Sequence, residues 1–519
     1  KQALAYFRLA GDAAARVYAS EEALDHYERA LELAQQLGQA EAVIELLLAR
    51  GRVAYRAGRL GGARADYDDA LVRARAAGLR TLELQALEEI GWCLLVGGAR
   101  IRDTIARLDD ALAIARELQD ETASARIQSR LAIASTHALR FAEADRYSRA
   151  ALELARRTDD ERLLATTLDS AKTVAVYLGD FAALRAIQEE LGVLLRRVAD
   201  SWYLQWMLFE SALPLMAEGR FEQADAAIGE ALELNRRIGD HATEPYFVAV
   251  RGWLHRTAGE YQQALDLGRR AAELATGLGH RSSWLVWSET LLGQTLLELG
   301  AYRTAAERLR RGLEGAEGSA GPLYVFRCAA WLAVAELELG DRAAASNALD
   351  RAERILEGLS TPRGRVFLHG ADALLAVASV RARQGAVEPA RQLAVPLVAA
   401  AERSRWREPI AAGSRLLARL RLEEGDLDGA ERDLRTALAA ARAGGLRGEQ
   451  LRAHAELGAV LARRGEEREA HEQRERAALL GADLAARIAD PTLRRSFLQT
   501  VAFAALSEAA TPSRPCPGV

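Results

Sequence analysis

Apolar side chains between residues 202 and 216 recur at intervals of four, three, four and three positions: Trp202, Trp206, Phe209, Leu213 and Met216. This spacing places all five on one face of an α-helix. Another face of the same helix carries Leu208, Ala212 and Leu215. The segment is therefore predicted to be a helix with two apolar faces, a core-facing one and a second stripe beside it.

Glycines divide the chain into units of about 40 residues. Each stands before a short polar turn, and successive members lie 40 or 41 residues apart except for gaps of 81 and 45: Gly58, Gly98, Gly179, Gly219, Gly259, Gly300, Gly340, Gly385, Gly425 and Gly465. Glycine is typical just past a helix end because it adopts the left-handed backbone conformation without a steric cost. A second set ends the other helix of its unit: Gly38, Gly78, Gly239, Gly279 and Gly445. Each unit is predicted as helix, glycine turn, helix, glycine turn.

Small residues follow these turns at fixed distances, with Ala five residues after most of the glycines and often again seven residues later. Small side chains let two antiparallel helices approach closely where they cross. The first unit, GDAAARVYASEEALDHYERALELA, shows the pattern in Gly11, Ala23, Tyr27 and Ala30. The spacing resembles that of the tetratricopeptide repeat (TPR). The resemblance implies an all-α fold, a right-handed α-solenoid superhelix of about twelve TPR-like helix-turn-helix repeats. TPR units usually have 34 residues, so the longer period predicts longer helices.

The 40-residue period also resembles the C-terminal TPR arms of bacterial STAND-type signalling ATPases and kinases. The opening YFRLAGDAAARVYASEEALDHYERALELA is similar to the start of such an arm, and ADLAARIADPTLRRSFLQT is similar to its end. The resemblance implies a sensor or regulatory arm, and hence a fragment of a larger ATPase or kinase. The alternative is a stand-alone protein–protein interaction scaffold. The chain itself has no P-loop, because Lys172 in LDSAKTV lacks the glycines of GxxxxGK[ST].

The repeat pattern predicts a division of the chain into five parts. Repeats one to nine occupy residues 1–356, an irregular insertion occupies 357–371, and repeats ten to twelve occupy 372–482. Capping helices are expected over 483–510 and a disordered tail over 511–519.

Composition argues against several partners and locations. The 69 basic and 73 acidic residues are interleaved and give a net charge of −4, so no global field attracts nucleic acid or a membrane surface. There is no run of 18 apolar residues to span a bilayer. Three widely separated cysteines fit a reducing, cytoplasmic compartment.

Catalytic and metal-binding patterns are weak. The eight histidines are isolated, there is no CxxC, and GLSTP at 358–362 lacks the last glycine of a GxSxG elbow. We therefore expect a protein that is not an enzyme and that has no cofactor and no metal.

The repeat frame aligns the central aromatic residues. Trp206, Tyr246 and Trp287 occupy the same position of three consecutive repeats, and Trp253 lies on the same predicted surface. The TPR resemblance implies that this is the concave ligand surface. Two interpretations follow. The stripe of Trp202, Trp206, Phe209, Leu213 and Met216, with Tyr246, Trp253 and Trp287, is either a groove or core packing between the lengthened helices. A groove would hold a protein or peptide partner, or a flat small-molecule effector, because exposed apolar patches and Trp or Tyr side chains mark binding sites.

Overall fold

The computed structural model describes residues 1–97, 100–198, 200–278, 283–317, 321–359 and 367–506, and within these ranges it is all-α. The first ten helices are α1 (Gln2–Arg16), α2 (Ser20–Gln36), α3 (Ala40–Arg56), α4 (Leu60–Ala77), α5 (Arg80–Val96), α6 (Ile101–Glu117), α7 (Glu121–His137), α8 (Phe141–Ala155), α9 (Glu161–Leu178) and α10 (Phe181–Val198). The next eight are α11 (Ser201–Glu218), α12 (Phe221–Arg237), α13 (Glu244–Ala258), α14 (Tyr261–Gly277), α15 (Ser283–Glu298), α16 (Tyr302–Glu317), α17 (Pro322–Glu338) and α18 (Arg342–Glu357). The last are a 3₁₀ turn η1 (Leu368–Gly370), α19 (Ala371–Arg383), α20 (Val387–Ser404), α21 (Arg407–Glu423), α22 (Leu427–Ala443), α23 (Arg447–Arg463), α24 (Glu467–Ala486) and α25 (Pro491–Leu506).

The predicted glycine turns are confirmed. Thirteen of the fifteen predicted turn glycines adopt positive φ. The other two, Gly98 and Gly279, lie outside the described residues. Where the pattern lacks glycine, Gln119 and Leu139 still adopt the left-handed conformation, at φ 55° and 58°. The turn is therefore kept by the repeat geometry even where the side chain disfavours it.

The small residues sit at helix crossings. A Cβ added to Gly11 would lie 2.8 Å from the ring of Tyr27 on the paired helix. Ala23 and Ala30 are completely buried. Each odd-numbered helix packs against the even-numbered helix that follows it, as the TPR-like units require.

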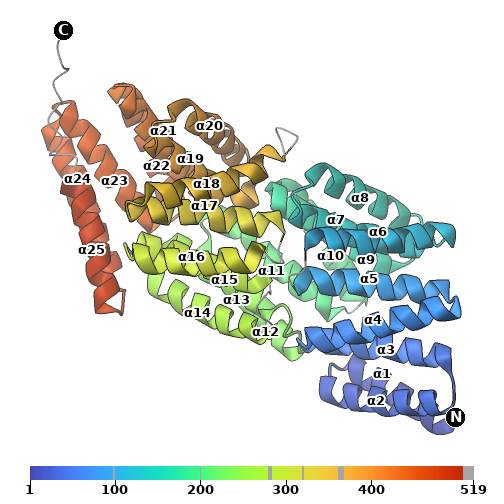
Figure 1. The fold of residues 1–519 in the computed structure, drawn as a ribbon. Helices are drawn as coiled ribbons and strands as arrows, with labels where there is room; N and C mark the ends of the chain where they lie inside the picture. Colours follow the sequence, from blue (N-terminus) through green and yellow to red (C-terminus); the bar gives the residue numbers. More distant parts are fainter. Residues whose placement is uncertain (98–99, 199, 279–282, 318–320, 360–366, 507–519) are drawn as a thin grey trace.

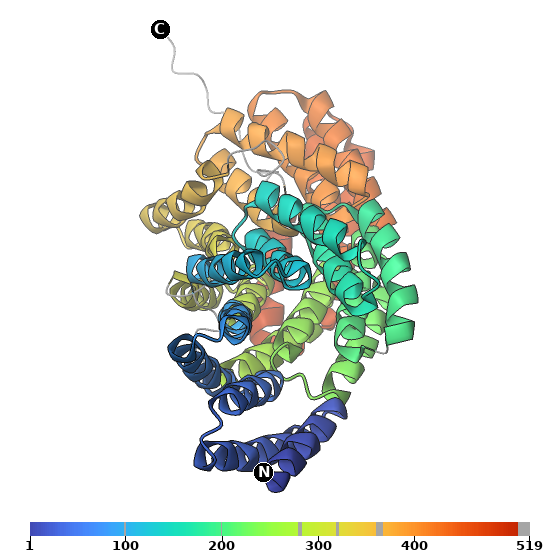
Figure 2. The same ribbon diagram turned by 90° about the vertical axis from the view of Figure 1, so that its right-hand side faces the viewer.

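The pairs wind into a superhelix whose successive turns touch. Figure 1 shows the helices from α1 and α2 at the N-terminus to α24 and α25 near the C-terminus. Some helices far apart in the sequence are in contact: α5 with α15, α11 with α21 and α13 with α23. The Ser404 hydroxyl donates a 2.8 Å hydrogen bond to the carbonyl of Gly179, 225 residues earlier. The amide of His241 likewise donates to the carbonyl of Arg56, at 2.9 Å. The view in Figure 2 shows these turns stacked around a common interior.

The predicted five-part division maps onto these helices as follows. Helix α18 ends at Glu357 and α19 begins at Ala371, while residues 360–366 lie outside the described ranges. Helices α19 to α23 and most of α24 fall in the predicted last repeats, whereas the end of α24 and all of α25 fall in the predicted cap. The predicted tail, 511–519, lies outside the described residues, and the division itself stays a prediction.

Candidate ligand-binding interior

Two chambers open into the interior of the superhelix. The C-terminal chamber has a volume of about 430 Å³, and its lining comes almost entirely from α13, α15, α17, α19, α21 and α23. The N-terminal chamber has a volume of about 380 Å³ and is lined mainly by α3, α5, α7, α9 and α11. Odd-numbered helices supply most of both linings because the first helix of each repeat faces the superhelix axis.

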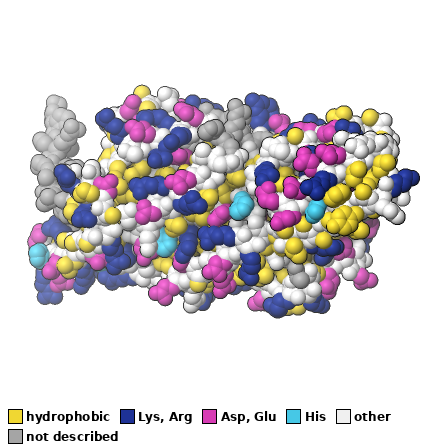
Figure 3. All heavy atoms as spheres, turned by 90° about the horizontal axis from the view of Figure 1, so that it is seen from below, with side chains coloured by type: hydrophobic (Ala, Val, Ile, Leu, Met, Phe, Trp, Pro, Cys, Tyr) yellow, Lys and Arg dark blue, Asp and Glu magenta, His cyan; other side chains and the backbone are white. Residues whose placement is uncertain are grey.

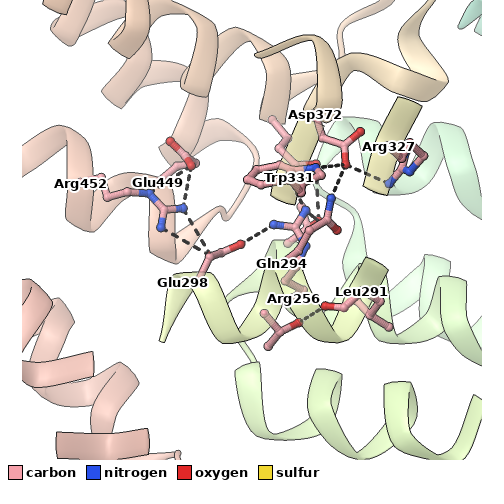
Figure 4. A network of polar contacts seen from close by, with 12 residues as sticks. Arg256, Leu291, Gln294, Glu298, Arg327, Trp331, Asp372, Glu449 and Arg452 are labelled. Carbon is pink, nitrogen blue, oxygen red and sulfur yellow. Dashed lines mark hydrogen bonds and ion pairs between the residues drawn. The ribbon is translucent and has the colours of Figure 1, made fainter. Parts of the chain in front are cut away.

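A chain of ion pairs between buried and partly buried side chains crosses the floor of the C-terminal chamber (Figure 4). Arg256 pairs with Glu298 and, at 2.7 Å, with Glu408. Glu298 also reaches Arg452 at 3.5 Å, and Arg452 pairs with Glu449 at 2.7 Å. Burial alone would raise the pKa of Glu449, but Arg452 and Arg415 hold that pKa at about 2. The Glu449 carboxylate therefore stays charged near pH 7.

A second polar cluster fixes the opposite wall of this chamber. The Asp372 carboxylate accepts hydrogen bonds from Gln294 at 2.5 Å, Arg327 at 2.9 Å and Trp331 at 3.2 Å (Figure 4). The guanidinium of Arg327 lies 4.4 Å from the ring centroid of Trp287. Charge-assisted bonds and the cation–π contact hold these side chains in one arrangement.

The rim of the C-terminal chamber is open to solvent. The side chain of Arg419 is 48% exposed and that of Arg383 is 42% exposed, whereas that of Arg256 on the floor is 6% exposed. The chamber is thus a pocket with a charged floor and an exposed rim, where Arg383 pairs with Glu338 and Arg419 pairs with Glu456. On the face shown in Figure 3, basic and acidic side chains are interspersed over the exterior.

The N-terminal chamber combines aromatic walls with paired charges. Its rings are Tyr27, Tyr55, Tyr67, Trp92, Trp202 and Tyr203. Glu89 pairs with Arg52 at 2.8 Å and with Arg130 at 3.4 Å. Burial would raise the pKa of Glu89, but Arg130 and Arg52 hold that pKa at about 2.

Five aromatic residues of the predicted groove form a row from the N-terminal chamber to the C-terminal chamber. Ring contacts run from Trp202 through Trp206 and Tyr246 to Trp287 and Trp253, with successive centroids 5.6 to 6.2 Å apart. Of the eight residues predicted as a groove, six are buried: Phe209, Leu213, Met216, Tyr246, Trp253 and Trp287. Trp202 and Trp206 are partly exposed.

Only some of these side chains face a chamber or the small cavity next to it. Trp253 lines the C-terminal chamber and Trp202 the N-terminal chamber, while Trp206 and Tyr246 line the adjoining small cavity. Phe209 instead stacks on Phe247, with centroids 4.1 Å apart. Contact of the predicted groove with a partner stays a prediction.

The charged chamber residues were missed from the sequence. Arg256, Glu298 and Glu408 look like ordinary solvated residues of amphipathic helices, and they meet only because distant helices converge. One signal was available for Lys172, the only lysine besides Lys1 in a chain rich in arginine. Its side chain is completely buried.

Comparisons with known proteins define the class by fold alone. No model of a protein family and no curated protein sequence matches the chain. Among solved structures it is similar to the Rap protein complexed with competence and sporulation factor, with a TM-score of 0.50 and 13% identity over 70% of this chain and 99% of that one. It is also similar to the APC/C hetero-tetramer Cut9–Hcn1, with a TM-score of 0.51 and 12% identity over 97% of this chain and 95% of that one. A STAND protein with a tetratricopeptide repeat sensor from Pyrococcus horikoshii aligns with a TM-score of 0.42 and 15% identity over 65% of this chain and 53% of that one.

The fold is thus an all-α solenoid of TPR-like repeats. In the part of the chain that the structure describes, no helix is long and apolar enough to cross a bilayer. Nor do the described His, Cys, Asp and Glu side chains form a group of three or more that could hold a metal ion.

Proposed function

We propose that the protein is a non-catalytic binding superhelix whose C-terminal chamber takes up a peptide or a segment of a protein partner. The observation that carries this proposal is the chamber of about 430 Å³, closed by a floor of paired charges and open at a rim of exposed arginines. A peptide presents charged side chains, termini and amide groups together. A charged group of the peptide can replace one member of an ion pair on the floor, so that the remaining charge keeps a partner.

The fold offers a precedent. The solved Rap protein, whose fold is similar, is complexed with competence and sporulation factor. We retain as candidate partner contacts those residues of the predicted groove that line a cavity. Trp253 lines the C-terminal chamber, Trp202 lines the N-terminal chamber, and Trp206 and Tyr246 line the adjoining small cavity. Aromatic side chains in such positions are the favoured anchors of protein interfaces.

The finer role that we propose is that of a sensor arm of a bacterial STAND-type ATPase or kinase. The 40-residue period and the resemblances at both ends of the sequence support it. In the C-terminal chamber, a ligand would contact Arg256 and Glu408, which lie 152 residues apart on different turns of the superhelix. A ligand that binds one packing of the turns better than another increases the population of that packing. An attached domain that contacts the turns could then shift between its resting and active states. The alternative is a free-standing scaffold.

Selection of peptides from a random display library against the intact 519-residue chain tests the binding role. Enriched peptides should bind the wild type and lose at least tenfold in affinity for the Arg383→Gln, Arg419→Gln double variant. Arg435→Gln, a substitution at an exposed position on α22, is the matched control and should bind normally. If no peptide is enriched, or if the double variant binds as well as the control, the chamber is not the binding site. An in-frame P-loop domain encoded immediately upstream would support the arm, and its absence would favour the scaffold.

A further inference from the structure

Lys172 lies between two carboxylates in the interior of the superhelix. Its Nζ is 2.8 Å from Asp169 one turn earlier on α9, and 2.5 Å from Glu210 on α11. Both carboxylates are more than nine-tenths buried. Among the described residues, no second basic side chain forms an ion pair with either of them. Two carboxylates thus share one ammonium, which leaves one negative charge in excess when both are ionised.

The two carboxylates face a small aromatic cavity, which we call the cage. The cage has a volume of about 60 Å³, enough for a small head group. Its aromatic walls are Tyr55, Trp92, Tyr177, Trp202, Trp206, Tyr246 and Trp284. It adjoins the N-terminal chamber, because Tyr55, Trp92, Asp169 and Trp202 line both spaces.

The walls of the cage have the chemistry of a cation site. Aromatic faces attract an ammonium group, and the attraction is strongest where water is excluded. The described lining of the cage includes no arginine. Its histidine, His137, is neutral near pH 7 because burial lowers the pKa of its imidazole to about 4. The nearby Arg130 of the N-terminal chamber is paired with Glu88 and Glu89.

Unused polar groups also point to a ligand. The hydroxyl of Tyr55, a side chain that is 7% exposed, finds no hydrogen-bond acceptor among the described residues. The buried indole nitrogen of Trp206 likewise has no partner there. Buried polar groups are normally satisfied, so two such donors around one cavity call for an acceptor that the chain does not supply.

We propose that the cage binds the ammonium head of an organic cation, either a primary or a methylated alkylammonium. The rest of the ligand extends into the N-terminal chamber, where one of its acceptor atoms can accept a hydrogen bond from the Tyr55 hydroxyl. The source of the cation is either a lysine side chain of a peptide or a small amine. This site is separate from the C-terminal chamber, so its test does not depend on peptide binding there.

Calorimetric titration of the intact chain tests the proposal. Burial, together with the neighbouring Asp169, raises the pKa of Glu210 to about 7. The titrations are therefore done at pH 8, where its carboxyl group is mostly ionised. The probes are choline, n-butylammonium and 3,3-dimethylbutan-1-ol, the neutral isostere of choline. We expect saturable binding of at least one cation and at least tenfold weaker binding of the alcohol.

Two variants locate the binding site. Glu210→Gln keeps the side-chain shape but removes the charge, and Trp202→Leu removes one wall of the cage. Each should weaken the binding of the cation, Glu210→Gln at least tenfold and Trp202→Leu severalfold. Circular dichroism checks that both variants are folded. Arg435→Gln, at an exposed position on α22 that lines neither chamber nor the cage, is the control and should bind cations as the wild type does.

Two results would overturn the proposal even if a variant fails to fold: no saturable binding of either cation to the wild type, or binding of the neutral alcohol as tight as that of the cation that binds. Unchanged binding by both folded cage variants would overturn it as well. The tripeptide Gly-Lys-Gly, compared with its norleucine analogue, distinguishes the sources. Tighter binding of the lysine peptide than of n-butylammonium supports a peptide source, and binding of choline alone supports a small amine.

Discussion

The backbone of Gly219, at the end of α11, lies directly against the backbone of Gly444, at the end of α22. A Cβ added to Gly219 would overlap the Cα and carbonyl of Gly444. The two glycines belong to successive turns of the superhelix, so their contact sets how closely the turns approach. Only glycine fits there, because even a methyl group would push the two backbones apart.

Gly219→Ala should therefore destabilise the protein more than the same change at Gly340. Both glycines have φ of +83°, but Gly340 has nothing within 4 Å of an added Cβ. Gly340→Ala should lower the free energy of unfolding by about 1 kcal/mol, because alanine is strained in the left-handed conformation. Gly219→Ala should lower it by about 1 to 3 kcal/mol more because of the overlap. Urea denaturation measures both, and small-angle scattering should show expansion only for Gly219→Ala. Equal losses would mean that the turns separate freely.

Gln119→Gly should stabilise the protein. Gln119 lies two residues after the end of α6, with φ of 55° and an exposed side chain, so glycine removes the strain without losing a buried contact. The expected gain is about 0.5 to 1 kcal/mol, because part of the relief is offset by the larger conformational freedom of glycine in the unfolded chain. Gln35→Gly in the last turn of α2 is the control and should lower the denaturation midpoint. A lower midpoint for Gln119→Gly would contradict the strain argument.

The helix ends could be predicted from the sequence because their cause is local. A left-handed residue after a helix is favoured by glycine at that position, whatever lies elsewhere in the chain. The contacts between superhelix turns have no such local cause. The pairing of His137 with Tyr324, 187 residues apart, depends on the pitch of the superhelix, which sums small rotations over several repeats.

The candidate site shows the same division. The spacing of Trp206, Tyr246 and Trp287 correctly indicated that the three rings lie in one row, because repeat position is read from the sequence. The depth of that row could not be read in this way. Trp287 is buried because Arg327 and His369 pack against it from later repeats. An apolar stripe therefore indicates a face, and the winding of the chain decides whether that face meets solvent.

Trp287→Ala tests how much of the row is structural. Trp287 is 4% exposed and contacts the rings of Tyr246, Trp253 and His369. Its truncation should therefore cost about 3 to 5 kcal/mol. Trp202→Ala removes a partly exposed ring and should cost clearly less. Circular dichroism during urea denaturation measures both, and a negligible loss for Trp287→Ala would mean that this ring stands free of the core.

Acid should destabilise the protein through His137. The ring nitrogens of this buried side chain lie 3.2 Å from the Tyr177 hydroxyl and 3.0 Å from that of Tyr324. Burial lowers the pKa of His137 to about 4, from an ordinary value of 6.5. Between pH 6.5 and 4 the unfolded chain therefore binds more protons than the folded one, so the free energy of unfolding falls as the pH falls. The contribution is fully present above pH 6.5.

Comparison with a variant isolates this effect from the other titrating groups. From pH 7 to pH 4.5 the wild type should lose about 2 to 3 kcal/mol more than His137→Gln, a neutral side chain that still hydrogen-bonds. His471→Gln, an exposed position on α24, is the control and should follow the wild type. Urea denaturation at each pH measures the three proteins. If His137→Gln loses stability in parallel with the wild type, the imidazole takes up a proton as readily in the folded chain as in the unfolded chain, which would contradict the argument.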